Sequence, residues 1–313
     1  MIFSFDLKIA RLIGAVLRPW QRRFVKVVGQ NDGRVPMTLI TGASSGIGAA
    51  LALELGRAGD HLLLVGQDEG RLQSIVADVR ADVSKGFDNK ELSNKELSNQ
   101  ELGTQKIVPV VVDLTDSAAL DKIDAVLNEQ GGYVDRLINN AGLGERDDFL
   151  ASDFDQLARV IEVNVQALMR LSHHFLPGMV DRGEGALVNM ASIGGLAPAP
   201  YQSVYYASKA FVISFTEALA HEVRGRGVYV GAVLPGPVKT RFHHKIGGQR
   251  ALYYWLLWKM RPKSVARSVH RALLARHWAV ITPGPFYMVL GAFLRVIPGS
   301  LLAPMFGFLY KKR

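Results

Sequence analysis

Short apolar runs alternate with longer amphipathic segments through the centre of the chain. The apolar runs end at small or polar residues and lie at 37–41, 61–66, 106–114, 134–142, 185–192, 228–236 and 278–284. Segments of helical length lie between them, at 46–58, 117–130, 153–176 and 204–223. Apolar runs that alternate with helices predict a parallel sheet covered on both faces. Right-handed crossovers then give an α/β, doubly wound sheet of about seven strands, with its ligand beyond the carboxyl ends of the strands.

The two ends of the chain do not follow this alternation. Residues 1–35 carry apolar residues every three or four positions, with basic residues largely off that stripe, which predicts an amphipathic helix that Pro19 kinks or restarts. Residues 285–313 are apolar, but Arg295 and the pair Pro298–Gly299 divide them. Neither half reaches the ~20 residues of a membrane-spanning helix, so we expect two short apolar helices.

A polar stretch at 82–105 interrupts the pattern between the second and third predicted strands. It contains a near-repeat of five residues, KELSN, KELSN and QELGT. Three such units are too short and too polar to stack as a solenoid. The stretch therefore reads as a solvated surface insertion within a single domain that spans 36–284.

Charge is distributed unevenly along the 313 residues. The chain has 37 Lys and Arg against 28 Asp and Glu, a net charge of +9. Residues 1–35 hold seven basic and two acidic residues, 36–240 hold 17 and 26, and 241–313 hold 13 and none. All four tryptophans lie outside the acidic centre. Basic charge mixed with large apolar residues is more typical of a membrane surface than of nucleic-acid binding, which we do not expect.

Several kinds of site are excluded by the residue types. Without any cysteine, the chain has no disulfide framework, thiolate nucleophile or cysteine-ligated metal. The eight histidines include the adjacent pairs His173–His174 and His243–His244, whose side chains diverge on a helix. We therefore predict no metal site.

A glycine-rich turn follows the first predicted strand. The sequence TGASSGIG places Gly42, Gly46 and Gly48 before a helix. Glycines there let the backbone turn tightly and approach a pyrophosphate, whose charge is met by free N–H groups at the start of the helix. The position between a strand and a helix makes this turn a candidate phosphate-binding site.

The turn is one of several motifs that resemble the short-chain dehydrogenase/reductase family, in the family's order, over about residues 36–284. The others are NNAG after the fourth strand, an asparagine on the next helix, a serine closing the fifth strand, a Tyr-x-x-x-Lys pair and a PG turn followed by a threonine. They correspond to Asn139, Asn140, Ala141, Gly142, Asn164, Ser192, Tyr205, Lys209, Pro235, Gly236 and Thr240. The resemblance implies a Rossmann-type fold. In its flanks, the chain is similar to membrane-associated reductases of lipid metabolism within this family.

Tyr205 and Lys209 are four residues apart on a predicted helix, so both side chains share one face. A lysine ammonium and an oxidised nicotinamide beside a phenol are expected to lower the pKa of the phenol from its usual value near 10. Such a phenol gives a proton to a carbonyl oxygen during reduction, or takes it from an alcohol during oxidation. Ser192 donates a hydrogen bond to the same oxygen. Tyr206 is expected to pack rather than to react.

Further roles are implied by the resemblance alone. Lys209 would hold the hydroxyls of the nicotinamide ribose, and Asn164 would position a water that relays protons to Lys209. Together with Ser192 and Tyr205 these make up the expected catalytic set. The expected contacts with the dinucleotide are Thr41, Gly42, Ser44, Ser45, Gly46, Ile47, Gly48, Gln67, Asp113, Leu114, Asn140, Ala141, Gly142, Tyr205, Lys209, Pro235, Gly236, Val238 and Thr240.

The choice between dinucleotides depends on the end of the second strand. An acid there would bind the ribose 2′-hydroxyl and repel a 2′-phosphate, whereas a basic residue would attract the phosphate. The sequence has Gly66 and Gln67 at these places, so neither diagnostic residue is present. Without a repelling carboxylate, and with the hydroxyls of Ser44 and Ser45 nearby, NADP(H) is favoured. Asp68 keeps NAD(H) as an alternative.

The resemblance implies a variable loop at 237–262 that faces the substrate. Its block YYWLLW would be a poor solvent-exposed loop, so we expect it to cover an apolar substrate, with Tyr253 and Trp255 as contacts beside Ser192 and Tyr205. Core packing, a subunit interface or insertion into a bilayer are alternatives for the same block.

These features predict an NAD(P)(H)-dependent oxidoreductase that interconverts a ketone and a secondary alcohol, acting on a hydrophobic or lipid-like substrate. Two alternatives are a soluble reductase of small ketones or sugars whose flanks serve oligomerisation, and a dinucleotide-binding sensor without turnover. We expect a homodimer or homotetramer in the cytoplasm, peripheral on the inner face of a membrane. Arg11 interrupts the N-terminal apolar stretch and no small-residue cleavage site follows, so a secretory signal is not expected; a transit peptide stays open.

Overall fold

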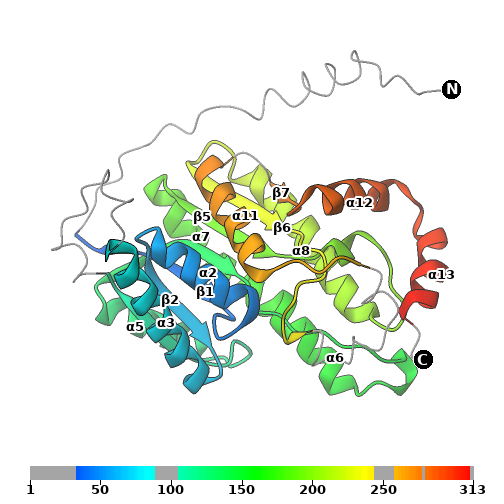
Figure 1. Ribbon diagram of the computed structural model, residues 1–313, viewed down its shortest axis with the longest axis horizontal. Helices are drawn as coiled ribbons and strands as arrows, with labels where there is room; N and C mark the ends of the chain where they lie inside the picture. The colour runs from blue at the N-terminus through cyan, green and yellow to red at the C-terminus, as the bar shows by residue number, and fades with distance from the viewer. Residues whose placement is uncertain (1–32, 89–104, 243–256, 277–278, 311–313) are drawn as a thin grey trace, which may run out of the picture.

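The computed structural model describes residues 33–88, 105–242, 257–276 and 279–310 (Figure 1). The predicted N-terminal helix, the repeats of the polar stretch, and most of the predicted substrate loop, including Tyr253 and Trp255, lie outside these residues.

Seven parallel strands form the sheet, in the order β3-β2-β1-β4-β5-β6-β7. The strands are β1 (Val35–Thr41), β2 (His61–Gly66), β3 (Ile107–Val111), β4 (Gly132–Asn139), β5 (Gly185–Met190), β6 (Val228–Val233) and β7 (Val280–Ile281). The strand order reverses between β1 and β4, and this is where a doubly wound sheet opens a crevice at the carboxyl ends of its strands. The predicted fold class is confirmed.

Strands β3 and β7 fall furthest short of their predicted lengths. β3 ends at Val111 because Asp113 turns the chain, its Oδ1 accepting hydrogen bonds from the backbone N–H of Thr115 at 2.9 Å and from the Thr115 hydroxyl at 2.7 Å. β7 has only two residues, and Pro283, which has no N–H to donate, follows two residues later.

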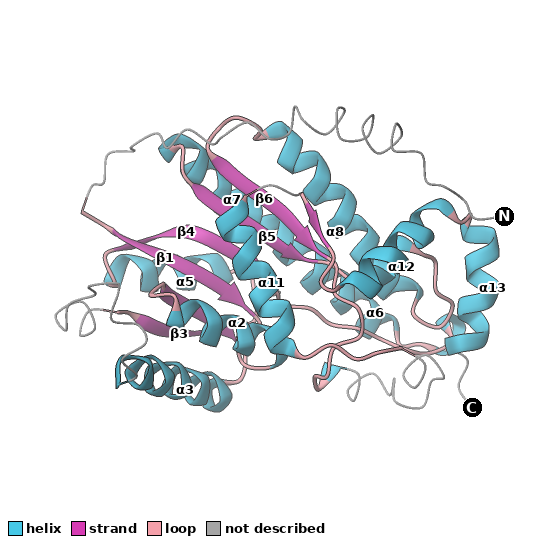
Figure 2. Ribbon diagram, turned by 45° about the horizontal axis from the view of Figure 1, so that its top comes forward, coloured by secondary structure: helices cyan, strands magenta, loops and turns pink. Residues whose placement is uncertain are grey.

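Helices cover both faces of the sheet (Figures 1 and 2). One face packs against α2 (Gly46–Arg57), α3 (Glu69–Asp88) and α11 (Pro262–Ala275). The other packs against α5 (Ala119–Glu129), α7 (Leu168–Arg182) and α8 (Ser203–Glu222).

Side chains of β2 show why its sequence is apolar at successive positions. Leu62 and Leu64 belong to the apolar cluster on one face, and Leu63 and Val65 belong to the cluster on the other. Side chains alternate between the faces of a strand, so a strand covered on both sides needs apolar residues throughout.

Helical structure differs from prediction in two places. The predicted helix at 153–176 is α6 (Phe154–Ile161), a π-helical turn at Glu162–Ala167 and then α7, which continues to Arg182. Helix α3 runs on to Asp88, so the first residues of the polar stretch are helical.

The C-terminal segment forms two short helices, as predicted. They are α12 (Pro285–Val296) and α13 (Gly299–Tyr310), which meet at Pro298 and lie together at one end of the molecule (Figure 2). Among the described helices, none combines the length and apolar character needed to cross a membrane.

The buried centre of the sheet makes the stability of the fold testable. Leu63 is completely buried in β2, so Leu63→Ala is expected to lower the free energy of unfolding by about 2–5 kcal/mol. Denaturant titration measures this loss as a lower midpoint. Leu150 is 93% exposed, and Leu150→Ala serves as the matched control with a change of about 0.5 kcal/mol or less. Equal losses in the two variants would contradict the described core.

Candidate active site

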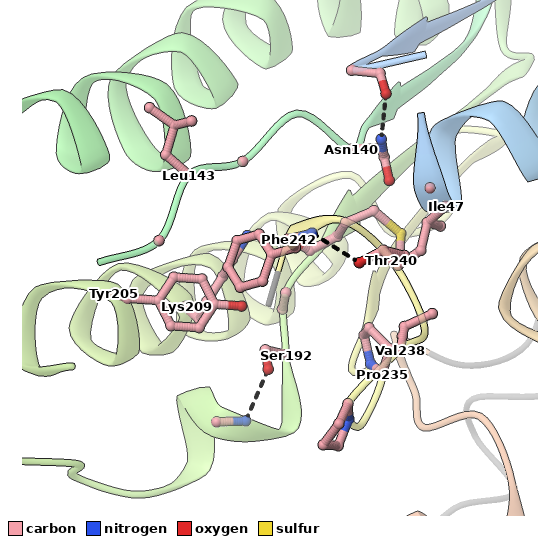
Figure 3. A pocket seen from close by; sticks show the side chains of 18 of the residues that line it. Ile47, Asn140, Leu143, Ser192, Tyr205, Lys209, Pro235, Val238, Thr240 and Phe242 are labelled. Atoms are coloured by element: carbon pink, nitrogen blue, oxygen red, sulfur yellow. Dashed lines mark hydrogen bonds between the residues drawn. The ribbon is translucent and has the colours of Figure 1, made fainter. Parts of the chain in front are cut away.

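A cavity of about 950 Å³ opens at the carboxyl ends of the strands. The loops that follow β1, β2, β4, β5 and β6 line it, together with α8 and the C-terminal helices α12 and α13. Figure 3 shows part of its lining, with Tyr205, Lys209 and Ser192 on one side and Asn140 and Ile47 on another. The cavity therefore lies where the reversal of strand order predicts a ligand site.

Hydrogen bonds tie the end of β1 to the end of β4 beneath this cavity. The hydroxyl oxygen of Thr41 accepts from the backbone N–H groups of Asn140 at 2.9 Å and of Ala141 at 3.0 Å. The amide Nδ2 of Asn140 donates to the carbonyl oxygen of Thr41 at 2.9 Å and to that of Gly42 at 3.3 Å. The glycine-rich turn and the NNAG segment are thus held as one unit.

Two glycines are required by this close approach. Gly42 has a φ of 65°, and a Cβ there would lie 2.8 Å from the Cα of Ala141. A Cβ on Gly48 would lie 2.3 Å from the carbonyl oxygen of Gly42. A side chain at either place would therefore force these backbone segments apart.

Ser192, Tyr205 and Lys209 face the cavity from the end of β5 and from α8. The Lys209 ammonium donates to the carbonyl oxygen of Met190 at 2.8 Å and lies 5.9 Å from the centre of the Tyr205 ring. Burial lowers the pKa of Lys209 to about 8.

Burial also raises the pKa of Tyr205 to about 12, against the lowering effect of a hydrogen bond with Ser192. The chain alone therefore keeps the phenol protonated, whereas the lowered pKa expected from the sequence includes the positive charge of an oxidised nicotinamide. Burial is the largest influence on this pKa, and the Lys209 ammonium is directed to a backbone carbonyl.

Asn164 lies in the π-helical turn, behind the cavity lining. Its Oδ1 accepts from the N–H of Leu143 at 2.8 Å, and its Nδ2 donates to the carbonyl oxygen of Leu143 and to the Ser208 hydroxyl, both at 2.9 Å. A Cβ on Gly142 would lie 3.3 Å from Asn164 Oδ1 and 3.4 Å from Lys209 Nζ. Asn164 thus fixes the segment that passes in front of Lys209. π-Helical turns are frequent at such functional positions.

Most of the predicted dinucleotide contacts line the cavity. Those that do are Gly42, Ser44, Ser45, Gly46, Ile47, Gln67, Leu114, Asn140, Ala141, Gly142, Tyr205, Lys209, Pro235, Gly236, Val238 and Thr240. The other three do not line it but contact residues that do: Thr41 contacts Asn140, Gly48 lies against Gly42, and Asp113 pairs with Arg159.

Three arginines that the sequence reasoning missed also line the cavity, Arg71, Arg159 and Arg241. Arg159 of α6 donates to the Asp113 carboxylate at 2.5 Å. Burial alone would raise the pKa of Asp113, but hydrogen bonds from Thr115 and Arg159 together lower it. Arg71 lies in the first turns of α3, where its Nε is 3.1 Å from the Asp68 carboxylate. Arg71 could have been identified from the sequence, because it follows soon after the second predicted strand.

Beside the glycine-rich turn, a second hollow shares part of this lining. It is bordered by the basic residues Arg71, Lys239, Arg241 and Lys259 and by the hydroxyls of Ser44, Ser45, Ser74 and Thr240. Of the described residues that border it, none is acidic. The hollow suits an anionic group close to Ser45.

The other end of the main cavity is apolar. Its walls include Phe242 and Leu257 and, from the C-terminal helices, Leu290, Leu294, Met305, Phe306 and Leu309. Tyr205 and Phe242 have ring centres 5.4 Å apart. The sequence reasoning placed the substrate on the 237–262 loop and missed the contribution of α12 and α13, because apolar helices at a chain end give no indication of where they pack.

Tyr206 and Tyr310 connect α13 to the catalytic helix. Their hydroxyls are hydrogen-bonded to each other, and both rings are buried. The Arg146 guanidinium donates to the carbonyl oxygen of Tyr310 at 2.9 Å. These contacts hold α13 against the cavity. Within the described residues, we find no group of three or more His, Asp or Glu placed to hold a metal ion.

Comparison with known proteins identifies the family that this chain resembles. The family model described as short chain dehydrogenase matches residues 36–90 and 85–251. An uncharacterized short-chain type dehydrogenase/reductase from Sinorhizobium fredii is 34% identical over 226 residues, covering 70% of this chain and 78% of the relative. The very-long-chain 3-oxoacyl-CoA reductase of Bos taurus is 30% identical over 239 residues, covering 75% and 69%.

Among solved structures, a short-chain dehydrogenase from Sphingobium yanoikuyae in complex with NADPH superposes with a TM-score of 0.67. It is 30% identical to this chain, and the match covers 84% of this chain and 96% of the other.

Proposed function

We propose that this chain, which belongs to the short-chain dehydrogenase/reductase family, reduces an apolar ketone to a secondary alcohol, with Tyr205 as the acid. Members of the family are oxidoreductases that act on CH–OH groups with a nicotinamide dinucleotide. The observation that carries the proposal is the placement of Ser192, Tyr205 and Lys209 on one wall of a cavity that is polar at one end and apolar at the other.

The polar end has the features that a dinucleotide requires. Gly42 and Gly48 leave room for backbone where a Cβ would clash, and the N-terminus of α2 faces the cavity through Ser45, Gly46 and Ile47. Free N–H groups there bind phosphate oxygens. A bound nicotinamide dinucleotide would supply the hydride.

Tyr205 and Ser192 act on the substrate oxygen. A phenol held protonated at neutral pH donates its proton to the oxygen of a ketone as negative charge develops there. The Ser192 hydroxyl lies within hydrogen-bond reach of this phenol, and on substrate binding it donates its hydrogen to the same ketone oxygen. Lys209 places a positive charge on the same face of α8, close to the oxygen on which Tyr205 and Ser192 act.

The apolar end supports a hydrophobic substrate. Phe242 on one side and the inner face of α12 and α13 on the other offer no charged group to a polar molecule among the described residues. The relative from Bos taurus is named for a long acyl substrate, which agrees with this character. This chamber favours an apolar or lipid-like ketone over a small sugar.

Tyr205→Phe tests the chemical role. The variant keeps the ring but loses the proton donor, so kcat for ketone reduction is expected to fall at least ~100-fold while NADPH binding is retained. Steady-state kinetics with a panel of apolar ketones, and NADPH titration by fluorescence, measure the two effects. Tyr133→Phe is the matched control, because Tyr133 lies in β4 and packs against Arg182 away from the cavity. Comparable rates in both variants would rule out the mechanism.

We propose NADP(H) rather than NAD(H) as the cofactor. The basic hollow beside Ser45 supports this choice, since Arg71 and its neighbours offer positive charge where the adenosine end of the dinucleotide is expected. Asp68 neutralises part of the Arg71 charge, so the selectivity also depends on Lys239 and Lys259.

Arg71→Gln is expected to weaken NADPH binding about 10-fold, because one charge-assisted hydrogen bond to phosphate is lost, and to leave NADH binding unchanged. Calorimetric titration with each dinucleotide measures the two affinities. The exposed Arg271 of α11 provides the control, Arg271→Gln. A tighter affinity of the unaltered protein for NADH than for NADPH would refute the proposed preference.

We also propose that α12 and α13 dock on an anionic membrane surface. Their outer side exposes large apolar side chains, with exposed fractions of 56% for Phe286, 76% for Val296, 66% for Leu301 and 65% for Phe308. The last 73 residues hold 13 basic and no acidic residues, which matches anionic head groups. Homodimer or homotetramer formation and a cytoplasmic location stay predictions.

Replacing Phe286 and Phe293 together by serine is expected to reduce binding to vesicles that contain phosphatidylserine, because both side chains are more than half exposed on α12. Vesicle flotation measures the bound fraction, which should also fall in high salt. The control replaces two other exposed residues by serine, Leu150 shortly before α6 and Phe154 at its first position. If the unaltered protein stays unbound at low salt, the docking proposal is wrong.

A further inference from the structure

Glu145 lies at the start of the catalytic helix without lining the cavity. It follows the NNAG segment closely in sequence, and its Oε1 accepts a hydrogen bond from the backbone N–H of Tyr205 at 3.2 Å. The N–H of Val204 also contributes a hydrogen bond to the carboxylate. The carboxylate therefore caps α8, a helix of 20 residues, at the residue that carries the phenol.

A carboxylate is well suited to this place. The first N–H groups of a helix have no partner within the helix and carry partial positive charge. By accepting from Tyr205, Glu145 fixes the backbone of that residue relative to the NNAG segment. Arg146, the next residue, is buried and anchors the same segment to α13 through the Tyr310 carbonyl.

Charge at Glu145 also acts on the phenol. A phenolate at Tyr205 would be a second negative charge close to the carboxylate, and the repulsion raises the pKa of Tyr205 in addition to the larger effect of burial. Burial raises the pKa of the Glu145 carboxyl itself, and the Oε2 atom is buried.

Other polar and charged groups around Tyr205 come from several elements. Lys209 lies on the same helix, and Ser192 follows β5. Arg146 lies next to Glu145, Arg241 lines the cavity after β6, and Tyr310 of α13 reaches Tyr206. Among these, Glu145 is the carboxylate whose charge bears on the phenol, and it opposes ionisation.

We propose that Glu145 is a positioning residue, whose carboxylate holds the backbone of Tyr205 at the start of α8 and places a negative charge beside the residue that carries the phenol. The inference rests on the proposed role of Tyr205 as the acid. Reduction needs the protonated phenol and oxidation needs the phenolate. By opposing ionisation of the phenol, the Glu145 carboxylate favours reduction at neutral pH and moves the onset of oxidation to higher pH.

Three variants separate the two effects of Glu145. Glu145→Gln keeps an oxygen that accepts from the Tyr205 N–H but removes the charge. Glu145→Asp keeps the charge on a shorter side chain, and Glu145→Ala removes both. Asp135→Asn serves as the matched control, because Asp135 is a largely buried carboxyl near the opposite end of β4.

Two readouts measure the phenol. The first is the carbon-13 NMR signal of the hydroxyl-bearing ring carbon of Tyr205, assigned by its absence in Tyr205→Phe and titrated in the NADP⁺ complex. It requires no turnover, so it can fail or succeed independently of the proposed reaction. The second is the pH dependence of 1-phenylethanol oxidation with NADP⁺.

In Glu145→Gln we expect the Tyr205 signal to titrate at a pH lower by ~1 unit, and the rise of any oxidation rate with pH to shift in the same direction. Glu145→Asp should titrate closer to the unaltered protein, as should Asp135→Asn. An unchanged titration of Tyr205 in Glu145→Gln, or an equal shift in Asp135→Asn, overturns the proposal even if the enzyme reduces ketones.

Discussion

The hydrogen bonds between Thr41 and Asn140 are the constraint on which the site depends. They join the ends of β1 and β4, the two strands between which the order of the sheet reverses. Because both partners use side chain and backbone, the glycine-rich turn and the NNAG segment cannot move independently. Gly42 and Gly48 permit this junction, because a Cβ on Gly42 would clash with Ala141 and a Cβ on Gly48 would clash with the carbonyl oxygen of Gly42. From the junction the chain continues past Gly142 to Glu145, so the same constraint reaches the start of α8 and the phenol of Tyr205.

Burial and hydrogen bonding then divide the cavity into two chemical environments. At the polar end, helix N-termini and basic residues favour a phosphorylated ligand. At the apolar end, α12 and α13 supply one wall with their inner face and expose apolar side chains on the outer one. Tyr205 lies between these environments, and burial keeps its proton bound at neutral pH. Helices α12 and α13 thus form both a wall of the apolar end of the cavity and the surface that is proposed to dock on a membrane.

The sequence predicted the parts of the structure that depend on local chemistry. Apolar runs covered on both faces gave the sheet, and Gly42, Tyr205 and Lys209 lie on the cavity as their spacing indicated. Contacts between distant segments were not predictable, because no periodicity reports them. Arg159 reaches Asp113 across 46 positions, Glu145 reaches Tyr205 across 60, and Tyr310 reaches Tyr206 across 104. Burial raises the pKa of Tyr205 in the chain alone, an effect that cannot be read from residue identity, and the lowered pKa expected beside an oxidised nicotinamide stays a prediction.

The most direct measurement of the central claim is the fate of the hydrogen transferred during turnover. An apolar ketone is reduced in ordinary water with NADPH carrying deuterium at C4 of the nicotinamide, in separate reactions for each face, and the alcohol is analysed by mass spectrometry. The account predicts one deuterium at the carbinol carbon from one of the two labelled faces, with the hydroxyl proton taken from solvent through Tyr205. An alcohol without deuterium from either face, or no alcohol from any apolar ketone, would contradict it.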